Sequence, residues 1–229
     1  MRRFWKDVSV EQADRGWRVA LDGRPLKTQG GVHQVVPSRA LAEMLAAEWS
    51  AQGEEIDPAG FPLRDLADYA IDIVTADPAG TTAKVLRYAE TDTLCYRADP
   101  DEPLHKRQWQ EWEPVVSAFE TREGVRLERV SGIVHKSQPR ETLATLEARI
   151  AALDPFTLAA LEVATSLSAS LCVGLSALHP DTDPQSLWSA AELEETWQMD
   201  LWGSDAEAEA RRERRKADFM RAVEFARAA

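Results

Sequence analysis

The sequence has few of the patterns that mark metal-binding, nucleotide-binding or catalytic proteins. Its histidines are scattered, without a second metal ligand at helical or turn spacing, at His33, His105, His135 and His179. Its glycines form neither a G-x-x-x-x-G-K loop nor a G-x-G-x-x-G turn, which excludes the usual phosphate-binding loops. Ser176 lacks the second glycine of a nucleophile elbow, so we interpret it as a packing residue. We therefore expect no metal, no cofactor and no catalytic residue.

Cysteine and long apolar segments are also scarce. Cys95 and Cys172 lie far apart in apolar sequence and are predicted to be reduced, buried residues of a cytosol-like compartment. Residues 156–178 carry a single charge, Glu162, but six serines and threonines. A spanning helix needs about 20 mostly apolar residues, so we expect one buried helix or two short ones and no membrane insertion. The N-terminus has no apolar stretch behind its charges, and we expect no signal peptide.

Acidic and hydrophobic residues, by contrast, are abundant. The chain has 229 residues, 44% of them hydrophobic, which is enough for one large domain or two small ones. A formal net charge of -12 repels phosphate backbones and anionic lipids, so nucleic acid is not an expected partner. Eight tryptophans are many for this length, and exposed tryptophans usually have a use at an interface. We expect a soluble, acidic, helix-rich protein that acts by binding another protein.

The hydrophobic pattern changes from strand to helix near residue 37. Residues 8–21 alternate between apolar and polar, and Asp22-Gly23 predicts a tight hairpin. With residues 32–36 they predict a meander of about four antiparallel strands. Ser38 is placed to cap a helix that ends near Gly53, and a second helix follows with its apolar face over residues 63–74.

The rest of the chain is mainly helical, after a linker-like segment at residues 77–80. We therefore predict an α+β fold with two domains. Residues 1–78 form an N-terminal α+β domain, an antiparallel β meander with helices. Residues 79–229 form a C-terminal all-α orthogonal helical bundle.

Three aspartates are the one feature typical of an enzyme. Asp65, Asp68 and Asp72 share a helical face, because their spacings are three and four residues. A carboxylate-based hydrolase would need such groups in a cleft with separated pKa values. Arg64 lies four residues from Asp68, which favours a solvated acidic face. The hydrolase stays an alternative.

A second unusual segment combines carboxylates with bulky aromatics at residues 192–203. On a helix, one face would hold Glu194, Trp197 and Leu201, and the next face would hold Glu195, Met199 and Trp202. Such a segment is either the salt-bridged edge of a core or a patch that binds a basic and apolar partner surface.

Several segments together resemble the ATP-twelve chaperones. Two of them are Leu21-Asp22-Gly23-Arg24-Pro25-Leu26-Lys27-Thr28 and Thr91-Asp92-Thr93-Leu94-Cys95-Tyr96-Arg97-Ala98. The resemblance also includes residues 3–8, 48–52, 56–58, 62–63, 66–67, 70–72 and 88–90, and it closes with Glu195, Trp197, Gln198, Trp202, Gly203 and Asp205. It departs from the family pattern at Arg64, where threonine is expected, and at Glu194, where aspartate is frequent. Residues 125–178 match only loosely.

The resemblance implies a two-domain chaperone that uses no ATP, catalyses no reaction and holds the alpha subunit of ATP synthase during assembly of its catalytic head. It places partner contact at Glu194, Glu195, Trp197, Asp200 and Trp202. It also implies that Glu195→Lys weakens chaperoning without unfolding the protein. Trp49 matches a family tryptophan, but its position in an apolar helical stripe indicates a structural role.

A general holdase or adaptor is the other alternative. We expect a monomer. Lysine occurs at six positions only, and this preference for arginine favours a bacterial cytoplasmic protein. Mitochondrial relatives would need an import segment, which we do not find in the sequence.

Overall fold

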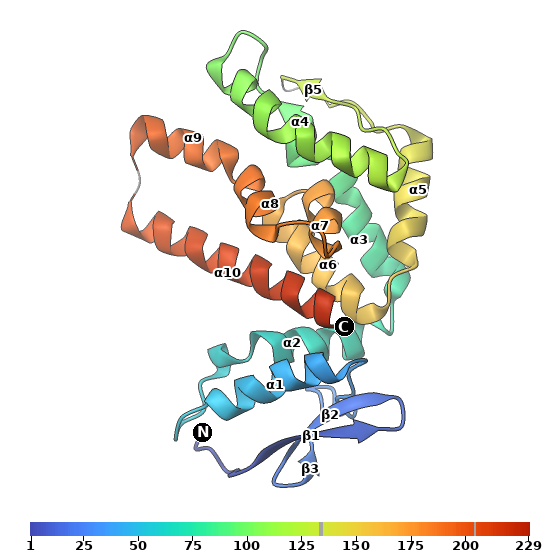
Figure 1. Cartoon of the computed structure of the whole chain (residues 1–229), viewed down its shortest axis with the longest axis vertical. Helices are drawn as coiled ribbons and strands as arrows, with labels where there is room; N and C mark the ends of the chain where they lie inside the picture. The colour runs from blue at the N-terminus through green and yellow to red at the C-terminus, as the bar shows by residue number, and fades with distance from the viewer. Residues whose placement is uncertain (133–134, 204) are drawn as a thin grey trace. The chain divides into compact units, whose positions relative to one another are not determined.

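The computed structural model describes residues 1–132, 135–203 and 205–229, and these form two compact units. Unit 1 consists of Met1–Pro78 with two later segments, Asp154–Ala160 and Glu224–Ala229. Unit 2 consists of Ala79–Leu153 and Leu161–Val223 (Figure 1). The first segment of unit 1 ends where the sequence predicts a boundary, and segments from the predicted second domain complete it. The division into domains 1–78 and 79–229 stays a prediction.

Unit 1 contains an antiparallel sheet of three strands in the order β1-β2-β3: β1 (Val8–Ala13), β2 (Gly16–Leu21) and β3 (Arg24–Pro25). The predicted hairpin turn joins β2 to β3, with φ of 48° at Asp22 and 74° at Gly23, as a two-residue hairpin favours. The Asp22 carboxylate also accepts hydrogen bonds from the backbone N–H groups of Lys6 at 3.0 Å and Asp7 at 2.9 Å. These bonds tie the start of β1 to the turn.

The predicted fourth strand is wrong. Within residues 32–36 the structure has only isolated bridges, between Trp17 and Val36 and between Lys27 and His33. In the loop before them, the N–H groups of Gln29 and Gly30 bond to the carboxylates of Asp68 and Asp72, as described below, and not to a neighbouring strand.

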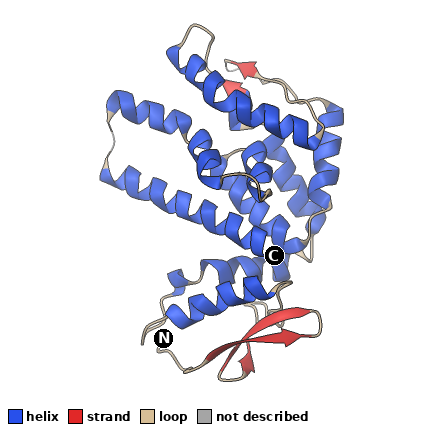
Figure 2. Cartoon of the chain, in the orientation of Figure 1, coloured by secondary structure: helices blue, strands red, loops and turns tan. Residues whose placement is uncertain are grey.

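Two helical segments follow the sheet: α1 (Arg39–Ala51), and α2 (Pro62–Tyr69) continued by a π-helical turn, Ala70–Val74. A short 3₁₀ turn, Pro58–Gly60, lies between them. The predicted cap is confirmed, because the Ser38 hydroxyl accepts a hydrogen bond from the Leu41 N–H at 3.0 Å. Helix α1 packs on β1 and β2 (Figure 2).

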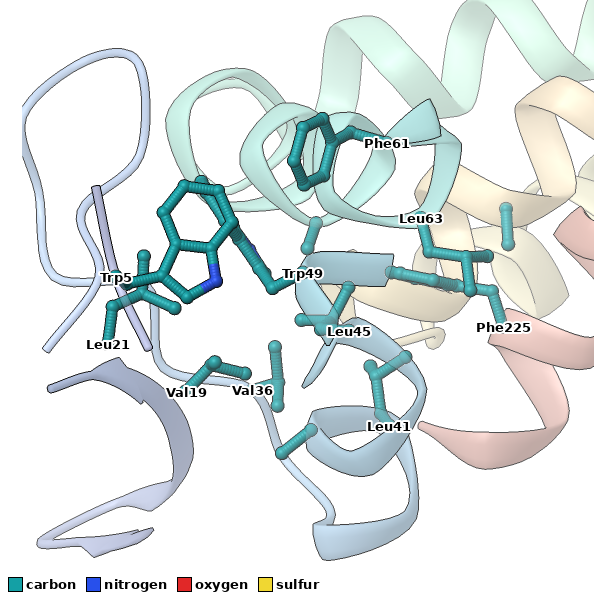
Figure 3. Packing of buried hydrophobic residues seen from close by; sticks show 13 residues of the cluster. Trp5, Val19, Leu21, Val36, Leu41, Leu45, Trp49, Phe61, Leu63 and Phe225 are labelled. Atoms are coloured by element: carbon teal, nitrogen blue, oxygen red, sulfur yellow. The ribbon is translucent and has the colours of Figure 1, made fainter. Parts of the chain in front are cut away.

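The buried core of unit 1 combines aliphatic side chains with four aromatic rings, those of Trp5, Trp49, Phe61 and Phe225 (Figure 3). The Trp49 ring lies 5.0 Å from the Trp5 ring and 4.5 Å from the Phe61 ring, measured between centroids. Edge-on and tilted contacts of this kind add stabilisation to that of burial. Because only 9% of Trp49 is exposed, its structural role is confirmed.

The described part of unit 2 is mainly helical and contains one parallel pair of two-residue strands, β4 (Tyr96–Arg97) and β5 (Val130–Ser131). The helices after residue 77 are α3 (Pro78–Glu90), α4 (Pro103–Glu123), α5 (Arg140–Ala151), α6 (Pro155–Ser168), α7 (Leu171–Leu178), α8 (Pro184–Ala191), α9 (Leu193–Trp202) and α10 (Ala206–Ala228). The first residues of α6 and the last residues of α10 belong to unit 1. The predicted fold class, α+β with a helical C-terminal part, is confirmed. The apolar segment at 156–178 is two short helices, and no helix of the described ranges is long and apolar enough to cross a membrane.

The start of α7 is fixed by a buried carboxylate. Asp92 accepts hydrogen bonds from the Leu94 N–H at 3.0 Å, the Ser170 hydroxyl at 2.7 Å and the Cys172 N–H at 2.9 Å. Burial raises the pKa of Asp92 to about 6, although these donors act in the opposite direction. Cys95 and Cys172 are free and buried, as predicted, and burial raises the pKa of both thiols.

Candidate functional site

Helix α9 carries all five residues predicted to contact a partner, and the first of them faces α4. Glu194 is half-buried, and its carboxylate accepts a hydrogen bond from the Gln108 amide at 2.5 Å. The other side of that amide accepts the Ala98 N–H at 2.8 Å. Burial raises the pKa of Glu194, against the effect of the Gln108 bond. Among the described residues no cation pairs with this carboxylate.

The neighbouring carboxylate faces α10. Glu195 is exposed and forms ion pairs with Arg215 at 2.8 Å and with Arg212 at 3.8 Å. Arg215 is held from its other side, because it donates to the Leu167 carbonyl at 2.9 Å and its guanidinium lies 5.8 Å from the Trp188 ring. Adjacent glutamates of α9 therefore contact different helices, as the predicted helical faces require.

The second half of α9 becomes increasingly exposed. Arg107 of α4 pairs with Asp200 at 3.5 Å and lies 5.9 Å from the centre of the Trp197 ring. Beyond this contact Leu201 is 58% exposed and Trp202 is 78% exposed. The helix thus ends in a turn whose apolar side chains project into solvent.

The five predicted residues are therefore close in sequence but do not line one pocket. Glu194, Trp197 and Asp200 lie on the α4 side, Glu195 lies on the α10 side, and Trp202 is free of both. The sequence analysis did not identify Arg107 and Gln108, which contact the residues on the α4 side. No sequence signal marks these two residues, because their partners are about ninety positions away.

The three aspartates of the alternative enzyme site bind a loop of their own chain. Asp68 accepts the Gln29 N–H at 3.1 Å, and Asp72 accepts the Gly30 N–H at 2.9 Å. Asp65 pairs with Arg64 at 2.6 Å. Further bonds join Asp72 to the Thr28 hydroxyl at 2.8 Å and Asp68 to the Gln34 amide at 2.6 Å. These contacts give the acidic face a structural role, as the support of the loop at residues 28–31.

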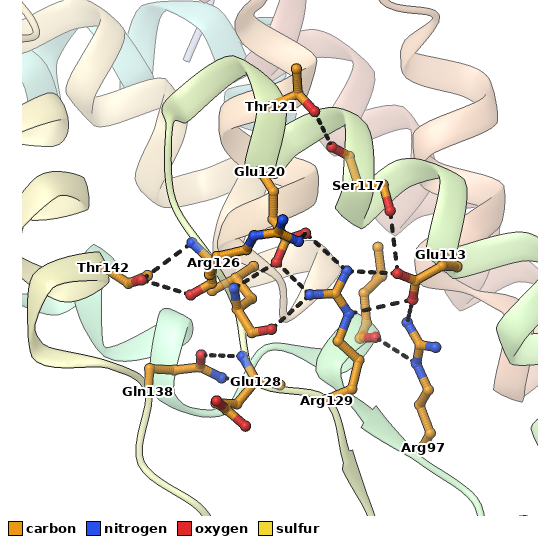
Figure 4. A network of polar contacts seen from close by, with 12 residues as sticks. Arg97, Glu113, Ser117, Glu120, Thr121, Arg126, Glu128, Arg129, Gln138 and Thr142 are labelled. Atoms are coloured by element: carbon orange, nitrogen blue, oxygen red, sulfur yellow. Dashed lines mark hydrogen bonds and ion pairs between the residues drawn. The ribbon is translucent and has the colours of Figure 1, made fainter.

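A larger network of ion pairs surrounds Glu113 and Glu120 of α4 (Figure 4). Arg129 reaches Glu113 at 2.8 Å and also pairs with Glu120, while Arg97 reaches Glu113 at 2.7 Å. Burial would raise the pKa of Glu113, but the two arginines outweigh it and lower that pKa. Arg126 also pairs with Glu120, at 3.7 Å, so the network holds three guanidinium groups and two carboxylates and joins α4 to β4 and to the segment before β5.

The described residues contain no group of three or more histidine, cysteine or acidic side chains placed to hold a metal ion. Helix α9 instead presents acidic and aromatic side chains within ten residues.

Comparison with known proteins identifies the family of the chain. A family model described as ATP12 chaperone protein matches residues 2–120, more than half of the chain. The mitochondrial protein atp12 of Schizosaccharomyces pombe is 27% identical over 215 residues, which cover 89% of this chain and 74% of that protein.

Two solved structures are similar over nearly their whole length. Atp12 from Paracoccus denitrificans is 36% identical with a TM-score of 0.92, and the match covers 98% of this chain and 96% of that one. The Atu1473 protein from Agrobacterium tumefaciens is 36% identical with a TM-score of 0.94, covering 99% of this chain and 85% of that one. The chain therefore belongs to the ATP12 chaperone family, as the resemblance in its sequence predicts.

Proposed function

We propose that the protein is a non-catalytic assembly chaperone for the catalytic head of ATP synthase and that its client is the unassembled alpha subunit. Membership of the ATP12 chaperone family supports the class of function. The exposed last turn of α9 is the observation that carries partner binding, because Trp202 is 78% exposed and lies beside Leu201. Exposed tryptophans are among the side chains that contribute most at protein interfaces.

The charges around this turn favour a basic and apolar client segment. Glu195 and Asp200 are exposed, and their present partners are surface arginines. Such pairs contribute little to stability, on the order of 0.2–1 kcal/mol, so a basic client side chain can share or replace them at low cost. The α9 contact surface, Glu194, Glu195, Trp197, Asp200 and Trp202, is thus suited to reversible binding.

Reversibility is what an assembly chaperone requires. An unassembled alpha subunit exposes the apolar surface that its beta neighbours later cover, and such a surface promotes aggregation. The chaperone masks this surface until the beta subunit replaces it. An interface of standard size with a few aromatic and charged anchors meets both demands. We place this action in the bacterial cytoplasm, with the chaperone as a monomer.

The test is refolding of purified alpha subunit by dilution, followed by light scattering, with beta subunit and an unrelated client in parallel. We expect suppression of aggregation for alpha alone, and a marked loss of suppression for Trp202→Ala. Phe4→Ala is the matched control, since Phe4 is an aromatic residue of unit 1 that is 69% exposed.

Equal suppression of all three clients would identify a general holdase or adaptor instead. No suppression of alpha would refute the proposal.

A further inference from the structure

A second aromatic side chain is exposed in unit 2, on α4. Trp109 is 52% exposed, and its ring lies 5.0 Å from the guanidinium of Arg97 and 6.5 Å from the His105 ring, to which it is stacked. Arg97 itself is only 4% exposed and is held by Glu113 at 2.7 Å. The indole therefore rests on a fixed support, so its binding to a partner costs little conformational entropy.

A pocket of about 440 Å³ lies beside this indole and shares Arg97 with it. Its lining includes Asp99 and Glu102 from the segment that enters α4, and Glu194 from α9. Arg97 forms its ion pair with Glu113, within the network of Figure 4. Its charge is shared with that carboxylate, and three acidic side chains line the pocket against this one arginine.

The pocket therefore has an excess of acidic side chains. Among the described residues none of Asp99, Glu102 and Glu194 has a cationic partner, and Glu194 is half-buried. Partly desolvated charges interact with an opposite charge more strongly than fully hydrated ones do. The pocket is thus complementary to a basic side chain, and the adjoining indole to an apolar one.

We infer that Trp109 and this pocket form a second client-contact surface, the Trp109 surface, which takes an arginine or lysine side chain in the pocket and a neighbouring apolar side chain on the indole. The inference rests on the proposed chaperone function and adds a surface to it. The Trp109 surface shares Glu194 with the α9 contact surface, but Trp109, Asp99 and Glu102 belong to it alone and can be changed separately.

The experiment compares four proteins with the wild type: Trp109→Ala, Trp109→Phe, the double variant Asp99→Asn with Glu102→Gln, and the control Phe4→Ala. Circular dichroism and thermal melting establish that each is folded. Fluorescence anisotropy then measures binding of labelled peptides that tile the alpha subunit. A model peptide of alternating leucine and arginine, and its leucine–glutamine counterpart, provide probes that do not depend on the client.

We expect Trp109→Ala to weaken peptide binding about tenfold, the range for an interface aromatic, and Trp109→Phe to retain most of the binding. The pocket variant should lose the preference for arginine over glutamine peptides and most of the salt dependence. Phe4→Ala should bind as the wild type does.

Unchanged peptide binding by both Trp109→Ala and the pocket variant overturns the inference, and so does a wild type that binds none of the peptides. If the wild type suppresses aggregation of alpha in either case, the proposed function still holds. Binding of the arginine peptide without any action on alpha would leave the Trp109 surface in place and refute the proposed client.

Discussion

Glu195→Lys removes the 2.8 Å ion pair with Arg215 and places an ammonium group beside Arg215 and Arg212. The carboxylate is 46% exposed, so solvent and salt screen both effects. Loss of an exposed pair costs about 0.2–1 kcal/mol, and like-charge repulsion at the surface is of similar size. We therefore expect a loss of about 1 kcal/mol in unfolding free energy. For a chain of this length that lowers the Tm by about 2–4 °C.

A charge swap separates this small structural effect from a role in client binding. Glu195→Lys with Arg215→Glu restores an ion pair of opposite sign but removes the Arg215 bond to the Leu167 carbonyl and its contact with the Trp188 ring. The Tm of the swap should therefore exceed the value expected from adding the losses of the two single variants. Suppression of alpha-subunit aggregation should not recover, because the client still meets a lysine at position 195.

Thermal melting and light scattering on the same preparations provide both readouts. A fall in Tm of more than about 10 °C for the single variant, or recovery of both properties in the swap, would show that Glu195 acts through the fold.

Two further variants test the supports of the fold. In Gly30→Ala the new Cβ would lie 2.8 Å from a carboxylate oxygen of Asp72, so this carboxylate must move and release the loop. We expect urea unfolding to show a loss of about 1–3 kcal/mol in unfolding free energy. The control is Gly53→Ala, whose new Cβ has its nearest neighbour 3.9 Å away and should be near neutral; equal losses in the two variants would refute this account. Asp92→Asn should be destabilising, because the amide nitrogen faces an N–H donor. Since the folded pKa of Asp92 is raised from 3.8 to about 6, its contribution to stability is present below pH 4 and lost as the pH rises through 6. The stability difference between wild type and Asp92→Asn should therefore be larger at pH 4 than at pH 7, and a difference that grows with pH would contradict the assigned environment.

Local signals in the sequence predict much of the fold. The hairpin at Asp22-Gly23 and the cap at Ser38 depend on residues within a few positions of each other, and both are confirmed. The strand expected at residues 32–36 is reduced to isolated bridges, and the loop before it is bonded at Gln29 and Gly30 to Asp68 and Asp72, about forty positions later. Alternation along a strand carries no information about such distant acceptors.

The candidate site shows the same limit. Helical spacing correctly separates Glu194 from Glu195 on α9, but it does not say which helix each face meets. Gln108 is 86 residues from Glu194, and Trp109 owes its fixed orientation to Arg97, which belongs to a different segment. These contacts arise only when distant elements pack together, so no periodic pattern in a single sequence can reveal them.

Unit 1 includes the last residues of the chain, and this affects the order in which the protein can fold on the ribosome. Phe225 is fully buried in the core of that unit, and the Ser38 hydroxyl donates to the carbonyl of Ala228. Residues 224–229 are translated after all of unit 2, and at about 5–20 residues per second this delay is on the order of ten seconds. During that interval the emerged strands and helix α1 lack part of their packing. The nascent protein thus exposes apolar surface of its own until its last residues are in place.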